Sequence, residues 1–346
     1  MKKILFCTKK IFLPSVIFGT ILLSGCGKRN FLYWVNKAAV AKDSEIRIKY
    51  YTNAINSWGL SDGSDRKTVI YRERANLYFK KGDYTSAIND YNEAIKLSPN
   101  DTSDYYNRGL IYYLRGDYPM VIKDFEKIIG RMPRYFEAYN ICGAAYGKIG
   151  DYKKAVFLIG QAIKINPKYT QAYYNRAIAF NGMGDYDKAI NDFRKTLELD
   201  KNDTNTYVGR ATAYFNKKRY ADALNDYEKA IKANPNLVIA YNNMGYIYFD
   251  LGNYKKALLN FSKSYRINPR YWDSILGLAM VNMKLKNPAL TEKYFKEASD
   301  IEPLLKNGIV GIEKLTNKGF FYTAQQKEIF KEIYGTINAS EKKALH

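Results

Sequence analysis

The sequence predicts an all-α protein, an α-solenoid superhelix of about seven stacked helix pairs with capping segments at both ends. Three residue columns predict it. Tyrosine recurs with a constant spacing of 34 residues, at Tyr84, Tyr118, Tyr152, Tyr186, Tyr220 and Tyr254. Alanine and proline keep the same spacing, at Ala87, Ala155, Ala189, Ala223 and Ala257, and at Pro99, Pro133, Pro167, Pro235, Pro269 and Pro303. A constant period in this range is typical of stacked repeats, each of which covers the apolar face of its neighbour.

Each repeat reads as two amphipathic helices. In the repeat 102–135, Tyr105, Gly109 and Tyr112 share one face of a first helix, and Val121 and Phe125 share one face of a second. These spacings match the 3.6-residue period of a helix that buries one side. We therefore expect the two helices of each repeat to pack against each other.

A glycine and an aspartate separate the two helices. Gly116 suits the left-handed position after a helix end, and Asp117 suits an N-cap that accepts backbone N–H bonds. The same role is predicted for the aspartates at Asp83, Asp151 and Asp185. Lys218-Arg219 departs from this pattern, so we expect that turn to be less sharply fixed.

The columns resemble the tetratricopeptide repeat (TPR). The fourth position carries Tyr71, Tyr105, Tyr139, Tyr173, Tyr207 and Tyr241, then Ile275. The eighth is small, at Ala75, Gly109, Gly143, Ala177, Ala211, Gly245 and Ala279. The predicted repeats span 68–305 as 68–101, 102–135, 136–169, 170–203, 204–237, 238–271 and 272–305. The resemblance is specific for fold and leaves the activity open.

Segments outside the repeats are expected to cap the array. Residues 26–67 contain a degenerate helical cap at Lys49–Ile55 and a polar loop from Gly59 to Lys67. Residues 306–346 contain a short helix, then a capping-box sequence, Thr323-Ala324-Gln325-Gln326, that opens a last helix ending near Gly335. The final tail is expected to fray.

Residues 1–25 are typical of a bacterial export signal. Four lysines precede an apolar run from Ile11 to Leu23, which is too short to span a bilayer as a helix. The run ends in Leu23-Ser24-Gly25-Cys26, which resembles the lipobox of bacterial lipoproteins. The resemblance implies cleavage between Gly25 and Cys26 and a diacylglycerol on the Cys26 sulfur.

The residue after the lipid cysteine bears on location. In the best-known Gram-negative sorting rule an aspartate there retains the protein at the inner membrane, whereas this chain has Gly27. We therefore expect a lipid-anchored envelope protein of the outer membrane that faces the periplasm. An ordinary cleaved signal or an uncleaved anchor is the alternative.

The composition is strongly basic, with a formal net charge of +21. Such a field favours anionic lipid headgroups, cell-wall polymers or nucleic acid, but the export signal argues against nucleic acid as a partner. The alternative is that these lysines form solvated faces without a partner.

Histidine chemistry is excluded because the one histidine, His346, ends the chain. A Ser–His–Asp or Cys–His centre and a multi-histidine metal site are therefore not expected. The Gly59–Gly63 stretch matches a nucleophile elbow on paper, but no strand precedes it. Cys142 is expected to be a small buried apolar group. We predict no enzyme activity, no metal and no cofactor.

The repeat resemblance also implies a groove lined by the second, fifth, sixth, ninth, twelfth and thirteenth residues of each first helix, where peptides commonly bind. The predicted groove residues are Arg72, Asn76, Phe79, Tyr106, Asn107, Tyr113, Asn140, Tyr174, Asn175, Asn181, Phe215, Asn242, Asn243 and Phe249. Asparagine offers both a donor and an acceptor to a peptide backbone, and aromatic rings offer contact area. The alternative is that Asn and Tyr are simply abundant in this chain.

Some repeats of this family clamp a peptide carboxylate with basic and Asn residues. Arg72, Asn76 and Asn107 fall on three of the clamp positions, but Glu137 stands on a basic one and would repel a carboxylate. A working clamp is therefore not expected.

Together these features predict a lipid-anchored scaffold or adaptor that binds other envelope proteins or peptides in its groove, for cell-wall enzymes or for secretion and pilus assembly. One alternative is a cell-wall polysaccharide-binding module, in which tyrosines stack on sugars. Another is a pilotin-like assembly factor for an outer-membrane secretion pore.

Overall fold

The computed structural model describes residues 31–59, 64–317, 320 and 322–344. Within these ranges every regular element is helical, so the predicted all-α solenoid of about seven helix pairs is confirmed. The predicted signal, including Gly25 and Cys26, lies outside the described residues. The chain divides into two compact bodies, an N-terminal body up to Gly182 and a C-terminal body from Met183.

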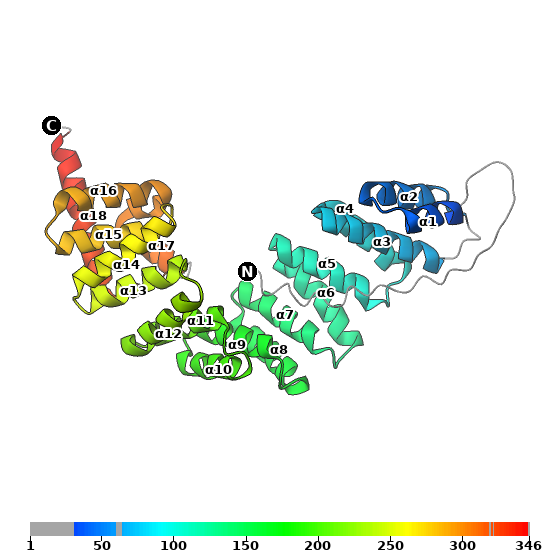
Figure 1. The fold of residues 1–346 in the computed structure, drawn as a ribbon, viewed down its shortest axis with the longest axis horizontal. Helices are drawn as coiled ribbons and strands as arrows, with labels where there is room; N and C mark the ends of the chain where they lie inside the picture. Colours follow the sequence, from blue (N-terminus) through cyan, green and yellow to red (C-terminus); the bar gives the residue numbers. More distant parts are fainter. Residues whose placement is uncertain (1–30, 60–63, 318–319, 321, 345–346) are drawn as a thin grey trace. The chain divides into compact units, whose positions relative to one another are not determined.

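The N-terminal body holds consecutive helix pairs, labelled in Figure 1. Its helices are α1 (Phe31–Val40), α2 (Ser44–Asn56), α3 (Ser64–Lys81), α4 (Tyr84–Leu97), α5 (Thr102–Arg115), α6 (Tyr118–Arg131), α7 (Phe136–Lys148), α8 (Tyr152–Ile165) and α9 (Thr170–Met183). The pair α1–α2 precedes the repeats and packs on α3, which gives the array a helical cap.

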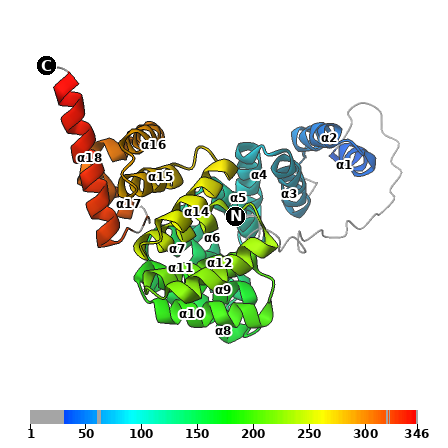
Figure 2. The same ribbon diagram turned by 60° about the vertical axis from the view of Figure 1, so that its left-hand side comes forward.

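The C-terminal body continues the pairs and ends in three further elements. Its helices are α10 (Tyr186–Leu199), α11 (Thr204–Asn216), α12 (Tyr220–Ala233), α13 (Val238–Asp250), α14 (Tyr254–Ile267), α15 (Trp272–Lys284), α16 (Pro288–Ile301), η3 (Pro303–Asn307), α17 (Gly308–Asn317) and α18 (Ala324–Ala344). Figures 1 and 2 both place α18, in red, beside α15, α16 and α17.

The turns inside the repeats follow the predicted chemistry. Gly116 has a φ of 75°, and the Asp117 side chain accepts a hydrogen bond from the Met120 backbone N–H at 3.4 Å. Asp83 and Asp151 cap α4 and α8 in the same way. A left-handed residue followed by an N-cap therefore sets the antiparallel course of the pair.

Two positions depart from this pattern. Asp185 occupies the N-cap of α10 without a capping bond from its side chain. Lys218 takes a φ of 58° although it carries a Cβ, and Arg219 gives α12 no side-chain cap. The turn between α11 and α12 therefore keeps its shape without the residues that favour that shape elsewhere.

The small residues of the eighth position mark tight contacts between helices. A Cβ added at Gly109 would lie 2.7 Å from the Phe125 ring. Phe261 is fully buried and packs between two glycines, because a Cβ at Gly245 or at Gly277 would lie 2.7 or 2.4 Å from its ring. The core therefore depends on glycine at the points where a large ring fills the space between helices.

The structure corrects two boundaries. Helix α3 begins at Ser64, inside the stretch predicted as a loop, and α18 continues through Gly335 to Ala344 instead of ending there. Ile333 and Ile337 are buried on either side of Gly335, so packing carries the helix past it. The capping box is confirmed: the Thr323 N–H donates to Gln326 Oε1 at 3.1 Å, and the Gln326 N–H donates to Thr323 Oγ1 at 3.3 Å.

Candidate functional site

The groove face is defined here as the second, fifth, sixth, ninth, twelfth and thirteenth residues of the first helices. In an α-helix these positions share one side, while the fourth, eighth and eleventh lie on the side that packs against the second helix. In α5 the groove face consists of Ser103, Tyr106, Asn107, Leu110, Tyr113 and Leu114.

Half of the predicted groove residues are buried: Arg72, Asn76, Asn140, Asn175, Phe215, Asn242 and Phe249. The others are half-buried: Phe79, Tyr106, Asn107, Tyr113, Tyr174, Asn181 and Asn243. The residues of the first set expose at most 9% of their surface, because neighbouring helices pack against them. Their contact with a peptide stays a prediction.

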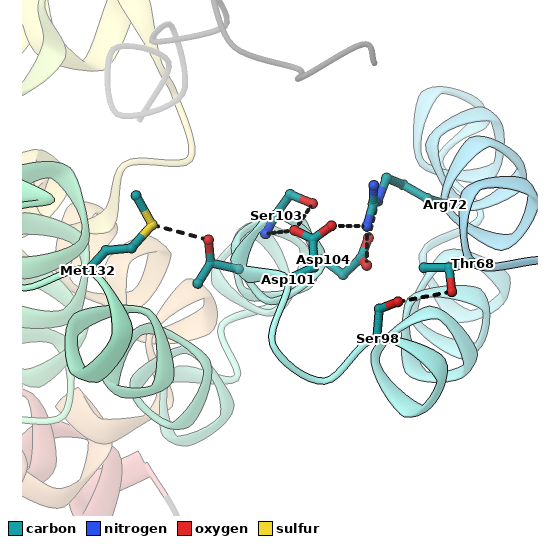
Figure 3. A network of polar contacts seen from close by, with 8 residues as sticks. Thr68, Arg72, Ser98, Asp101, Ser103, Asp104 and Met132 are labelled. Carbon is teal, nitrogen blue, oxygen red and sulfur yellow. Dashed lines mark hydrogen bonds and ion pairs between the residues drawn. The ribbon is translucent and has the colours of Figure 1, made fainter. Parts of the chain in front are cut away.

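Arg72 joins α3 to the start of α5, as Figure 3 shows. Its Nε donates to Asp104 Oδ1 at 2.6 Å and its Nη2 donates to Asp104 Oδ2 at 2.7 Å and to Asp101 Oδ2 at 2.5 Å. Asp104 is fully buried, and Asp101 also caps α5 by accepting from the Ser103 N–H at 2.9 Å. One guanidinium therefore holds two repeats together through two carboxylates.

This pairing excludes Arg72 from a peptide-carboxylate clamp. Burial opposes the charged guanidinium, but the hydrogen bonds and charges of Asp104 and Asp101 outweigh burial and raise the pKa of Arg72. The cation is permanently charged and already neutralised within its own chain. A ligand carboxylate would have to displace two intramolecular carboxylates to reach it.

The buried asparagines bind neighbouring helices. Asn140 Oδ1 accepts from Asn175 Nδ2 at 3.0 Å, and Asn76 Oδ1 accepts from the Tyr91 hydroxyl at 2.6 Å. Both bonds satisfy polar groups that burial has removed from water. The spaced asparagine series therefore links helices inside the array, and the ladder predicted for a peptide backbone is not supported at these positions.

A more open, apolar part of the groove face runs over α5, α7 and α9. Tyr106, Leu110 and Tyr113 of α5 are half-buried, as is Ile141 of α7. Leu114 of α5 is 36% exposed and Ile178 of α9 is 43% exposed. The groove face of these three helices therefore keeps apolar and aromatic side chains that are at least partly accessible.

The groove face is different along α15 from Asp273 to Met280 and in the C-terminal half of α13, because it is covered there. The ten residues from Asp273 to Asn282 of α15 are all buried. Asp273 Oδ1 accepts from the hydroxyls of Tyr246, at 2.9 Å, and Tyr322, at 2.6 Å, and Asp273 Oδ2 accepts from Asn242 Nδ2 at 2.7 Å. Burial raises the pKa of Asp273, and the bonds from these three neutral donors offset only part of that shift.

An Arg–Asp pair that recurs in several repeats joins the first helix of a repeat to its second helix. The sequence patterns considered above did not include it. Arg108 Nε and Nη2 donate to Asp124 at 2.9 and 2.5 Å, and the guanidinium lies over the rings of Tyr105 and Tyr112 at 5.6 and 5.9 Å. Equivalent pairs join Arg74 to Asp90 and Arg210 to Asp226. The signal was available, since each Asp follows its Arg by 16 residues. These pairs bind the two helices of a repeat to each other.

The remaining observations concern chemistry and membranes. Cys142 is fully buried, as predicted, and burial raises the pKa of its thiol to about 12. The described residues contain no cluster of three side chains suited to hold a metal ion. Among the helices that the structure describes, none combines the length and the apolar character needed to cross a membrane.

Family models match five segments of the chain. A model described as TPR repeat matches residues 75–116 and 211–252, and models described as tetratricopeptide repeat match 136–169, 170–203 and 238–271. A search of curated proteins gave no match.

The first two of the three solved structures described next share the fold, and the third is a partial match. A tetratricopeptide repeat protein from Parabacteroides merdae ATCC 43184 is 16% identical, with 78% of this chain and 99% of that chain covered and a TM-score of 0.60. A structure titled for Pseudomonas aeruginosa pilF is 14% identical, with 62% and 97% covered and a TM-score of 0.51. The MamA protein is 28% identical, with 48% and 91% covered and a TM-score of 0.46.

Proposed function

The chain contains tetratricopeptide repeats, and we propose that it is a scaffold that binds segments of other proteins on the groove face of α5, α7 and α9. One observation carries the proposal. Leu114 and Ile178 are exposed, and Tyr106, Leu110, Tyr113 and Ile141 are half-buried, on three successive first helices. Tyrosine is enriched among the few residues that supply most of the binding energy at protein interfaces, and accessible apolar side chains beside it add area that a partner can bury.

The proposed setting is the bacterial envelope, with the protein anchored by a lipid on Cys26 and facing the periplasm. The support comes from the sequence, in which a short apolar run ends in Leu23-Ser24-Gly25-Cys26. Two or three acyl chains give a stable anchor, whereas one gives only marginal binding. The scaffold would then gather exported proteins at a membrane surface.

Cell fractionation tests the anchor. Cys26→Ala should move the protein from the membrane fraction to the soluble fraction, because no other residue of the sequence carries the lipidation pattern. Cys142→Ala is the matched control and should leave the protein with the membrane. Retention of the Cys26→Ala variant in membranes would contradict the lipid anchor.

Site-specific crosslinking tests the binding face. A photoreactive residue at Leu114 or Ile178 should capture partner proteins in cells, identified by mass spectrometry. Phe157 of α8 is the control position, because it is 64% exposed and lies on a second helix. The captured partner should be recovered less when Tyr106, Asn107 and Tyr174 are replaced by alanine. Equal capture from Phe157, or undiminished recovery from the triple variant, would place the surface elsewhere.

A protein partner is favoured over a polysaccharide because tyrosines of the fourth position, such as Tyr105 and Tyr241, are buried and already lie beside cations. Lys263 Nζ lies 4.8 Å from the ring centre of Tyr241, and Arg131 lies 5.3 Å from that of Tyr105. A sugar would have to displace these cation–π contacts before it could stack on the rings. Sedimentation with purified peptidoglycan in the absence of other proteins would instead support the polysaccharide-binding alternative.

A further inference from the structure

The chain's own C-terminal segment, here Phe320 and Tyr322–Gln326, lies against α13 and α15. The Phe320 ring packs on Trp272 with 4.7 Å between ring centres, and the Tyr322 ring lies 5.9 Å from Tyr246. The Tyr322 hydroxyl donates to Asp273. Beyond them, Thr323 Oγ1 and Gln326 Nε2 donate to Asp250 Oδ1 at 3.1 and 2.9 Å. The segment therefore follows α13 from its middle to its end.

The repeats supply the acceptors of this contact, and the segment supplies the donors. Asp273 is the second residue of α15 and Asp250 the thirteenth of α13, and both are groove-face positions. Without the segment, Asp273 keeps its bonds from Tyr246 and Asn242, and Asp250 keeps its bond from the Tyr220 hydroxyl at 2.9 Å. The two carboxylates are therefore held in place by the array itself, as in a preformed binding site.

Neither carboxylate is neutralised by a salt bridge. Within the described residues, Asp250 and Asp273 accept hydrogen bonds only from hydroxyl and amide groups. Burial raises the pKa of both carboxyls despite these bonds. The positive charge of Lys218 acts on Asp250, but within the described residues it forms no salt bridge with this carboxylate. Donors brought by an incoming chain would therefore meet two carboxylates that are bound by hydroxyl and amide groups.

We propose that this face is a second peptide site, selective for an extended segment with an aromatic residue, a tyrosine two positions later and a hydroxyl residue next. Phe320, Tyr322 and Thr323 are the internal copy of that ligand and hold the site closed. A partner binds here by displacing the internal copy. The inference deepens the proposed scaffold function by naming a class of partner, and it concerns residues that the crosslinking test does not use.

The test uses a fluorescent peptide with the sequence of residues 317–327 (NKGFFYTAQQK). In the full chain, the internal copy competes at high local concentration, so wild-type protein should bind the peptide weakly. Phe320→Ala/Tyr322→Ala removes the competitor and should tighten binding, measured by fluorescence anisotropy, by about tenfold or more. In the control peptide, the residues that correspond to Phe320 and Tyr322 are both replaced by alanine. This peptide should not bind.

A second measurement needs no variant. Excess peptide added to wild-type protein should accelerate hydrogen exchange at the amides of residues 322–326, because the displaced segment loses its protection. Equal binding of the peptide to both proteins, or unchanged exchange in the wild-type segment at saturating peptide, would overturn the proposal. A failure to crosslink partners at Leu114 and Ile178 would not change the expected peptide binding or hydrogen exchange. The proposed binding face of α5, α7 and α9 and the proposed second peptide site can therefore be disproved independently.

Discussion

Helices α5 and α15 occupy the same place in their repeats, yet their groove faces differ. On α5, Leu114 is 36% exposed and Tyr106, Leu110 and Tyr113 are half-buried. On α15, every residue from Asp273 to Asn282 is buried. The periodic sequence determines which face of each first helix packs against the second helix of the same repeat. What covers the opposite face depends on segments outside the repeats, here Phe320, Tyr322 and α18.

Two buried carboxylates show the same contrast in chemical terms. Asp104 at the start of α5 pairs with the Arg72 guanidinium, a partner from the preceding repeat. Asp273 at the start of α15 receives neutral donors, one of them Tyr322 from beyond the repeats. The first contact lies within the array, and the second is completed by a segment outside the repeats.

The largest effect is expected at Arg72. Arg72→Ala leaves Asp104 buried without a counterion and should lower the free energy of unfolding by about 3–5 kcal/mol. Urea unfolding followed by circular dichroism measures it. Lys96→Ala is the control, because its pair with Glu93 is exposed and should cost at most about 1 kcal/mol. Equal losses for the two variants would show that the Arg72 pair does not hold the repeats together.

Tyr322→Phe tests the other carboxylate. The variant keeps the ring and removes one donor to Asp273, so it should cost about 1.5–3 kcal/mol. Tyr334→Phe removes a bond to the backbone oxygen of Lys306, an exposed neutral acceptor, and should cost about 0.5–1.5 kcal/mol. The difference in unfolding midpoint between the variants is the readout. A smaller loss for Tyr322→Phe would mean that Asp273 does not depend on this hydroxyl.

Gly109→Leu probes the face that both helices share, the one against the second helix. A side chain there meets the Phe125 ring, so overpacking should destabilise the fold by about 1–3 kcal/mol. Gly130→Leu is the matched control, because an added Cβ at Gly130 has no neighbour within 4 Å. It should leave the melting midpoint unchanged or slightly raised. Equal midpoints for the two variants would rule out a close contact at Gly109.

The smallest effect is expected at the turn without glycine. Lys218 holds a left-handed conformation, with φ 58°, which costs a residue with a Cβ about 1–2 kcal/mol. Lys218→Gly should therefore raise stability, by about 0.5–1 kcal/mol after the added backbone entropy of the unfolded chain. The reciprocal change, Gly116→Lys, should lower it by a similar amount. A destabilised Lys218→Gly variant would indicate that the Lys218 side chain makes a contact worth more than the strain.

The fold was predictable because its determinants are local and repeated. Gly116, Asp117 and Gly109 act within one helix pair, and the 34-residue period repeats them. The capping box at Thr323 and Gln326 was predictable for the same reason. The length of α18 was not, because burial of Ile333 and Ile337 against other elements overrides the glycine between them.

The groove was only partly predictable, because the burial of its residues depends on partners one repeat away or further. Asn140 pairs with Asn175, and Asn242 pairs with Asp273, across repeats. The position of a residue in a helix predicts the side of the helix on which it lies. It does not predict which part of the chain packs against that side. One sign of the covered face was present: the groove-face positions of α15 include Leu276 and Met280, so this helix is apolar on both sides. A helix that is apolar on all sides is one that neighbours enclose.

Helix α18 also limits how the molecule can grow. A solenoid whose terminal repeat is not capped can associate end to end with other copies, because the terminal repeat exposes the apolar surface that a further repeat would cover. Here Phe330 of α18 packs against Phe295 of α16, with ring centres 5.7 Å apart. The end surface of the last repeat is thus already covered by the chain itself, so a second copy would have to displace α18 before it could stack there.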